Sequence, residues 1–143
     1  MILCNLGSPP RKDIQPKLDL VILDCPDALE LARFYADLLG WSMEEGSDST
    51  FATLSPPGGG VSPDNPDGRT TLAFQQIADW VRPTWPGGTA PQQMHLDFSV
   101  GDIDAAEPQV LALGATVHRH QTSGNGGFRV YLDPVGHPFC LIR

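Results

Sequence analysis

Three side chains in the second half of the chain are of types that acid–base, thiol or metal chemistry uses. His95 and Asp97 are two positions apart, and Cys140 lies in the apolar run FCLI near the end of the sequence. Residues two apart on a strand share a face, so a strand here places His95 beside Asp97. A carboxylate can orient or charge an imidazole for proton transfer near neutral pH. We therefore name His95, Asp97 and Cys140 as candidate catalytic residues.

Each of these residues also has a purely structural interpretation. His95 could do no more than hydrogen-bond Asp97 or a backbone carbonyl inside the fold, since buried polar groups are normally paired. A free cysteine in an apolar strand usually packs as a small hydrophobic residue. A reactive thiolate at Cys140 would need a cationic neighbour such as protonated His95. Both interpretations stay open at the level of sequence.

The remaining histidines and Cys25 favour structural roles. His118 and His120 alternate on one expected strand, which is the spacing of a metal pair, but no third ligand recurs nearby. We expect a solvated strand face there. His137 lies in the final hairpin turn, where turn geometry is its expected role, and Cys25 directly follows an apolar run, where packing is expected.

The elements that would position the candidate residues occur twice along the chain. Stretches 18–43 and 94–117 both consist of a short apolar run, an Asp-led helix and a terminating glycine. Leu20 in the first copy aligns with His95 in the second at a spacing of 75, which is 95 minus 20. A duplicated half-module cannot normally bury its own apolar face, so the two copies must pack together, and the groove between them is the expected site.

Periodicity and turn residues predict the same order of elements in both copies. The first module, about 17–78, has expected strands at 18–24, 41–45, 51–54 and 70–76, with a helix capped by Asp27 and ended by Gly40. The second module, about 94–143, has expected strands at 94–100, 116–120, 128–132 and 138–142. Its expected helix runs from about 104 to 113, with Pro108 in or near the first turn. Residues 1–16 are expected to be a tail, and 79–93, rich in Pro and Gly, a linker.

Three segments together resemble the vicinal oxygen chelate superfamily, which includes glyoxalase I, bleomycin-resistance proteins and extradiol dioxygenases. The segments are DCPDALELARFYADLLGW, MHLDFSVGDIDAAEPQVLALGA and VYLDPVGHPFCL. The resemblance covers 17–143 and is closest to the small glyoxalase-like domains. It implies an α+β fold of two tandem βαβββ modules that form an open barrel-like sheet with the ligand inside. Homodimers are common among such relatives, so the resemblance also implies a homodimer.

The resemblance further identifies where a metal would bind. Metal-dependent relatives take ligands from the first and last strands of each module, which here carry Leu20, Ala73 (or Phe74 if the register slips by one), His95 and Cys140. Of these, His95 is the only typical ligand, and His95 with Cys140 makes an incomplete site. We therefore expect no metal and no other cofactor, and a divalent metal only if the protein is an enzyme of this superfamily.

The expected pocket is polar on one side and apolar on the other, because the face with His95 and Asp97 aligns with one carrying leucine and isoleucine. Trp85 lies in a loop between two prolines, where a large aromatic residue would cap a pocket or an interface. Large aromatic residues elsewhere, such as Phe74, can equally belong to the core. The candidate ligand-binding residues are Leu20, Phe74, Gln75, Trp85, Gln93, His95 and Tyr131.

The amino-acid composition limits the classes of partner that we expect for this protein. The 143 residues carry 9 basic and 17 acidic side chains, a net charge of -8 that repels nucleic acid and anionic membranes. The three cysteines, Cys4, Cys25 and Cys140, cannot all pair within one chain, and we expect neither a signal peptide nor a membrane-spanning run. We therefore expect reduced thiols and a cytoplasmic protein without nucleic-acid or membrane partners.

Two functional hypotheses follow. The leading one is a metal-free module that binds or sequesters a small, partly aromatic organic molecule. The alternative is a lyase, isomerase or dioxygenase of the glyoxalase type, with a divergent site around His95. A role in protein contacts through Trp85 is a weaker third possibility. The sequence leaves open whether the modules pair within one chain or between two chains.

Overall fold

The structure, a computed structural model, describes residues 16–143. The predicted tail is residues 1–16. Residues 1–15 of it, which include Cys4, lie outside the described residues. Within the described part of the chain, the helices are too short or too polar to cross a membrane.

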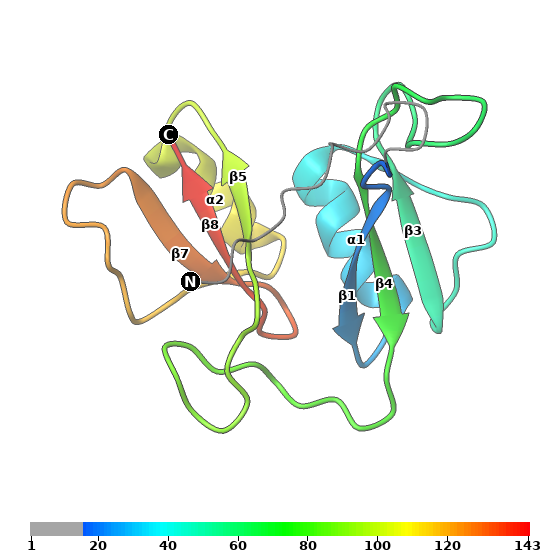
Figure 1. The fold of residues 1–143 in the computed structure, drawn as a ribbon. Helices are drawn as coiled ribbons and strands as arrows, with labels where there is room; N and C mark the ends of the chain where they lie inside the picture. The colour runs from blue at the N-terminus through cyan, green and yellow to red at the C-terminus, as the bar shows by residue number, and fades with distance from the viewer. Residues whose placement is uncertain (1–15) are drawn as a thin grey trace, which may run out of the picture.

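The two modules predicted from the sequence are both present (Figure 1). Each contains one strand, one helix and three further strands, which confirms the α+β class and the tandem βαβββ order. Module 1 consists of β1 (Leu20–Cys25), α1 (Ala28–Leu39), β2 (Ser42–Met43), β3 (Phe51–Ser55) and β4 (Thr71–Gln76). Module 2 consists of β5 (Leu96–Ser99), α2 (Ile103–Ala112), β6 (Thr116–Val117), β7 (Phe128–Leu132) and β8 (Pro138–Ile142).

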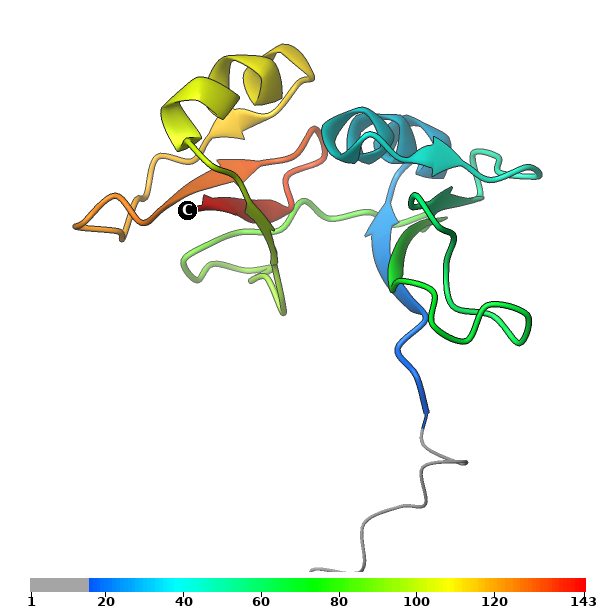
Figure 2. The same cartoon turned by 90° about the horizontal axis from the view of Figure 1, so that it is seen from above.

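Each module forms one four-stranded mixed sheet. The strand orders are β1-β4-β3-β2 and β5-β8-β7-β6, so the first strand of each module pairs in parallel with the last. Both helices lie on one side of the molecule, and the strands curve away from them without closing into a barrel (Figure 2). The modules contact each other within the chain through buried aromatic side chains.

An aspartate at the N-cap determines where each helix begins. Asp27 accepts a hydrogen bond from the backbone N of Glu30 at 2.9 Å, and Asp102 accepts one from Ala105 at 3.1 Å. Because Asp102 is the cap, α2 begins earlier than predicted, and Pro108 is its sixth residue. Placing Pro108 in or near the first turn was therefore wrong, and its missing N–H removes a bond from the helix interior.

The strand predicted at 116–120 is shorter than expected because His118, whose backbone N still donates to Val130 O at 2.9 Å, bonds locally through its ring and its carbonyl. Its Nδ1 accepts a hydrogen bond from the backbone N of His120 at 3.0 Å, and its carbonyl accepts one from Gln121 Nε2 at 2.7 Å. His118 is only 7% exposed, and its ring centroid lies 5.3 Å from that of Trp85. The expected solvated face is therefore wrong for His118, which the linker covers.

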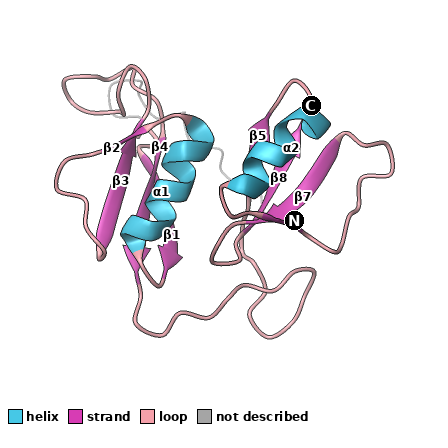
Figure 3. Ribbon diagram, turned by 180° about the vertical axis from the view of Figure 1, so that it is seen from behind, coloured by secondary structure: helices cyan, strands magenta, loops and turns pink. Residues whose placement is uncertain are grey.

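Aromatic residues join the modules where α1 faces module 2 (Figure 3). The ring of Tyr35 on α1 stacks on the ring of Phe74 in its own module, with centroids 5.3 Å apart. The ring of Phe98 in module 2 lies beside it at a centroid distance of 6.2 Å. Phe34, the preceding residue, lies 6.1 Å from Phe139 on β8. The two modules therefore share one core.

A buried hydrogen bond crosses the same junction. The Tyr35 hydroxyl donates to Asp133 Oδ2 at 2.8 Å, and both residues are almost fully buried. Asp133 Oδ1 in turn accepts three backbone N–H bonds from Val135, Gly136 and His137, at 2.8–3.0 Å. The DPVG turn is thus folded around one carboxylate whose other oxygen binds module 1.

The burial of Tyr35 beside Asp133 makes the free energy of unfolding depend on pH in the alkaline range. Burial, followed by the charge of Asp133, raises the pKa of Tyr35 well above its usual value of 10.0. The unfolded chain therefore loses this proton above pH 10 while the folded chain keeps it, so the free energy of unfolding falls as pH rises. We expect Tyr35→Phe to reduce that fall by up to about 1.4 kcal/mol per pH unit. Urea unfolding between pH 9 and 11 measures how steeply the free energy of unfolding falls with pH in the wild type and in Tyr35→Phe. Equal slopes in the two proteins would contradict the burial of an un-ionised Tyr35.

Candidate functional site

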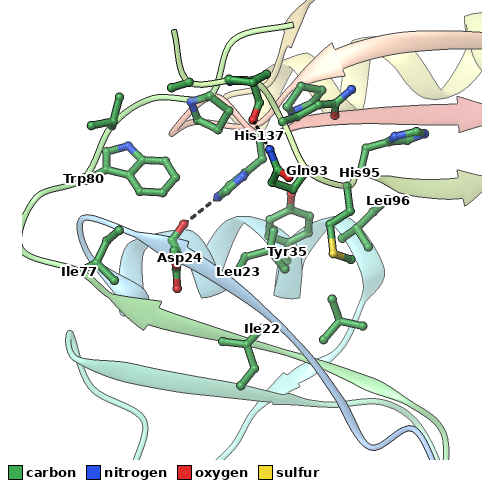
Figure 4. Close-up of a pocket in the computed structure, with 18 of the residues that line it drawn as sticks. Ile22, Leu23, Asp24, Tyr35, Ile77, Trp80, Gln93, His95, Leu96 and His137 are labelled. Carbon is green, nitrogen blue, oxygen red and sulfur yellow. Dashed lines mark hydrogen bonds between the residues drawn. The ribbon is translucent and has the colours of Figure 1, made fainter. Parts of the chain in front are cut away.

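A cavity of about 460 Å³ lies between the modules (Figure 4). Its walls come from β1, the linker and the start of β5, and Tyr35 and His137 also line it. The volume is within the range of sites for small organic ligands. The lining combines apolar, aromatic and polar side chains, among them Ile22, Asp79, Trp80, Gln93, His95 and His137.

The wall formed by module 1 is mostly apolar, with Asp24 as its charged residue. Strand β1 directs Val21 and Leu23 toward α1, so that Ile22 lies on the opposite face, where it remains 46% exposed. The linker contributes Trp80 and Val81 to the same cavity. An apolar or aromatic group of a ligand would find a complementary surface there.

His137 connects the linker, module 1 and module 2 at this cavity. Its Nε2 donates to the backbone oxygen of Asp24 at 2.7 Å, because a carbonyl can only accept. The ring also packs edge-on against Trp80, with centroids 5.0 Å apart. His137 therefore does more than shape the final turn, which was the only role expected for it.

The three candidate catalytic residues lie together on the open face of module 2. His95 Nε2 is 3.4 Å from Asp97 Oδ1, and Asp97 pairs in register with Cys140 on β8. One donor atom from each of the three side chains lies within 4.8 Å of the others. The side chains of His95 and Asp97 are about half exposed, whereas Cys140 is buried. His95 belongs both to this cluster and to the cavity wall.

Cys140 is held as a neutral thiol. Burial first, and then the nearby Asp97 carboxylate, raise its pKa from 9.0 to about 12. Burial likewise raises the pKa of the fully buried Cys25 to about 11, in agreement with the packing role expected for Cys25. A thiol with so high a pKa is a poor nucleophile at neutral pH. Cys140 is thus unsuited to covalent catalysis without a cation beside it.

Module 1 carries no equivalent cluster. Ile22 pairs with Ala73 in the same way that Asp97 pairs with Cys140, so Ala73, and not Phe74, is the counterpart of Cys140. Phe74 faces α1 and is fully buried. At the four strand positions where the superfamily binds metal, Leu20 and Ala73 have no donor atom. The residues present therefore do not fit a metal held between the modules.

Of the seven predicted ligand-binding residues, the structure places Gln93 and His95 at the cavity. Phe74 and Tyr131 are fully buried, where they stack on Tyr35 and Phe139. Trp85 instead covers His118 and His120 on module 2. Leu20 and Gln75 also lie outside the lining of this cavity.

Sequence reasoning missed His137 as a cavity residue and Asp97 as a third potential metal donor. A signal existed for Asp97, since strand alternation places it on the same face as His95. No spacing rule connects Trp80 with His137, because their contact depends on the path of the linker.

Comparison with known proteins places the chain in a structural context. A family model described as a glyoxalase-like domain matches residues 20–142. No curated protein sequence matches the chain. A glyoxalase/bleomycin resistance protein/dioxygenase family enzyme from Burkholderia phytofirmans PsJN superposes with a TM-score of 0.62 at 18% identity, covering 88% of this chain and 97% of that one. The fosfomycin resistance protein FosX from Listeria monocytogenes superposes with a TM-score of 0.59 at 14% identity, covering 90% and 93%. At these identities the two structures support the fold alone.

Proposed function

Since the chain belongs to the glyoxalase-like domain family, we propose that it binds a small organic molecule in the cavity between its two modules, without a metal bridging them. The family fold hosts varied chemistry, so the proposal rests on the site itself. One observation carries it: an open cavity of about 460 Å³ combines an apolar wall with a few polar side chains.

The chemistry of the walls indicates the class of ligand. Trp80 and Ile22 offer surface to an aromatic or branched apolar group, while His95 and Gln93 offer hydrogen bonds. Asp79 adds a carboxylate to the lining, and the whole chain has a net charge of -8. An anionic ligand is therefore disfavoured relative to a neutral or cationic one. We propose a partly aromatic molecule that carries a hydrogen-bond donor or an amine.

A cavity-filling substitution tests the proposal. Ile22→Trp places a bulky side chain in the cavity from an exposed position, so the core is undisturbed. We expect aromatic amines found by a thermal-shift screen to bind this variant at least about 10-fold more weakly, a loss of about 1.4 kcal/mol. Isothermal titration calorimetry of the screened amines, and of carboxylates with the same ring, measures the change and the charge preference.

Val117→Trp is the matched control. Val117 is a β-branched strand residue of nearly equal exposure, 44%, and lies outside the cavity lining. Its substitution should leave every affinity unchanged. Equal affinities of the wild type and Ile22→Trp would place the bound molecule elsewhere and contradict the proposal.

The second candidate function is an enzyme of the same family in which His95 transfers a proton. The 3.4 Å approach of Asp97 to His95 supports it, because a carboxylate stabilises the imidazolium that a base becomes. If one of the bound molecules is turned over, His95→Ala must abolish turnover while His120→Ala leaves it intact. Turnover that persists in His95→Ala would eliminate this candidate.

A further inference from the structure

We propose that a second cavity, beneath α2 of module 2, is a binding site for a compact uncharged ring such as a phenol. This cavity has a volume of about 310 Å³ and lies between α2, the strands β5 and β8, and the C-terminal end of α1. It shares no lining residue with the cavity between the modules. The proposal is therefore independent of the function proposed above.

The two helices can be aligned residue by residue from their N-caps. Asp27 and Asp102 have the same backbone conformation, and each accepts a hydrogen bond from the backbone N three residues later. Each position in α2 therefore corresponds to the position 75 residues earlier in α1, since 102 minus 27 is 75. Both helices also belong to modules whose sheets have the same strand order, so corresponding side chains meet corresponding strands.

Two large core side chains of α1 are replaced by smaller ones in α2. Leu31 and Tyr35 on α1 are each no more than 1% exposed. Their counterparts on α2 are Ala106 and Val110, and both of these smaller residues line the second cavity. The cavity therefore takes up space that an isobutyl group and a phenol ring fill in module 1.

Polar contacts between α2 and β7 prevent this space from closing. Glu107 on α2 takes the position of Ala32 on α1, which is fully buried. Glu107 Oε2 accepts hydrogen bonds from Tyr131 Oη and from Arg129 Nη1, both at 2.7 Å. Arg129 Nη2 also pairs with Asp104 Oδ1 at 2.8 Å. A glutamate that reaches β7 needs more room between helix and strand than an alanine does, so α2 stays away from the sheet.

The lining favours an uncharged ligand with one polar group. Apart from Ser99 and Gln109 its side chains are apolar, and none of them is charged. A charged group would therefore lose its hydration there without gaining a partner. Val110 and Leu141 are buried at the inner end, whereas Ser99 and Gln109 are exposed and can bond a hydroxyl at the mouth. A phenol, the group that Tyr35 supplies in module 1, meets both requirements.

Titration of the isotope-labelled full-length protein with phenol, followed by NMR of the backbone amides, tests the site. We expect the largest shifts at residues of the second cavity, such as Phe98 and Val110. Ala106→Leu and Val110→Phe restore side chains of the sizes found in α1, so both should bind phenol at least about 10-fold more weakly. Because they fill space that is open in the wild type, both should also raise the midpoint of urea unfolding.

Ala105→Leu is the matched control, because Ala105 is an exposed alanine of the same helix and lies outside the cavity lining. It should change neither the phenol affinity nor the urea midpoint. Ile22→Trp should also bind phenol as the wild type does, because Ile22 lines only the cavity between the modules. Loss of phenol binding in Ile22→Trp would place the phenol between the modules and overturn the proposal. Shifts absent from the second cavity, or a phenol affinity unchanged or a urea midpoint lowered in both filling variants, would overturn it too.

Discussion

Phe139→Ala is expected to lower the free energy of unfolding by about 3–5 kcal/mol, the usual cost of truncating a buried phenylalanine. Phe139 is fully buried on β8 and stacks on Tyr131 with ring centroids 5.5 Å apart. It also contacts Phe98 at 5.8 Å and Phe34 of module 1 at 6.1 Å. Truncation would therefore leave a cavity where the two modules join, and the neighbouring rings could not close it without shifting α1.

Phe51→Ala is the control for this prediction, because Phe51 lies on β3 and is 40% exposed. We expect it to cost less than about 1 kcal/mol, since little burial is lost. Urea unfolding followed by tryptophan fluorescence compares the variants. If Phe139→Ala lowers the free energy of unfolding by no more than Phe51→Ala does, the two modules do not share one core.

Asp133→Ala is expected to lower the free energy of unfolding by about 3–4 kcal/mol, since each buried group left without its partner costs about 1–3 kcal/mol. Alanine removes the acceptor for the backbone N–H groups of Val135, Gly136 and His137 and for the hydroxyl of Tyr35. The turn before β8 and the junction with α1 would weaken together. His137, whose imidazole lines the ligand cavity, would be displaced by the same change.

Asp133→Asn is the conservative comparison. Its amide oxygen can still accept the backbone bonds, and the Tyr35 hydroxyl can rotate to accept from its NH₂ group, so we expect a loss of only about 1 kcal/mol. A double-mutant cycle of Asp133→Ala with Tyr35→Phe isolates the bond across the junction, because each single change removes it. Additive effects in that cycle, or an Asp133→Ala loss as small as that of Asp133→Asn, would contradict the arrangement.

Much of the fold could be predicted because it repeats locally readable signals. Asp27 and Asp102 cap helices in both copies, and Gly40 ends the first with a φ of 66°, a left-handed conformation that glycine adopts at little cost. The constant spacing between the copies also aligned β1 with β5. Strand alternation then placed His95 and Asp97 on one face, as the structure confirms.

The candidate site was harder to predict because its contacts are long-range. Tyr35 and Asp133 are 98 positions apart, and no local pattern marks either as a partner of the other. The linker residues Trp80 and Trp85 were equally ambiguous, because a Pro- and Gly-rich segment has no periodicity to orient its side chains. In the structure Trp80 lines the cavity, whereas Trp85 covers His118.

A crystal structure of the protein with the tightest-binding amine from the thermal-shift screen tests the central claim most directly. We predict density for that molecule between β1 and β5, with its ring against Trp80 and Ile22 and its polar group within hydrogen-bond distance of His95 or Gln93. A ligand bound outside the space between the modules, or a metal ion bridging the two sheets, would contradict the claim.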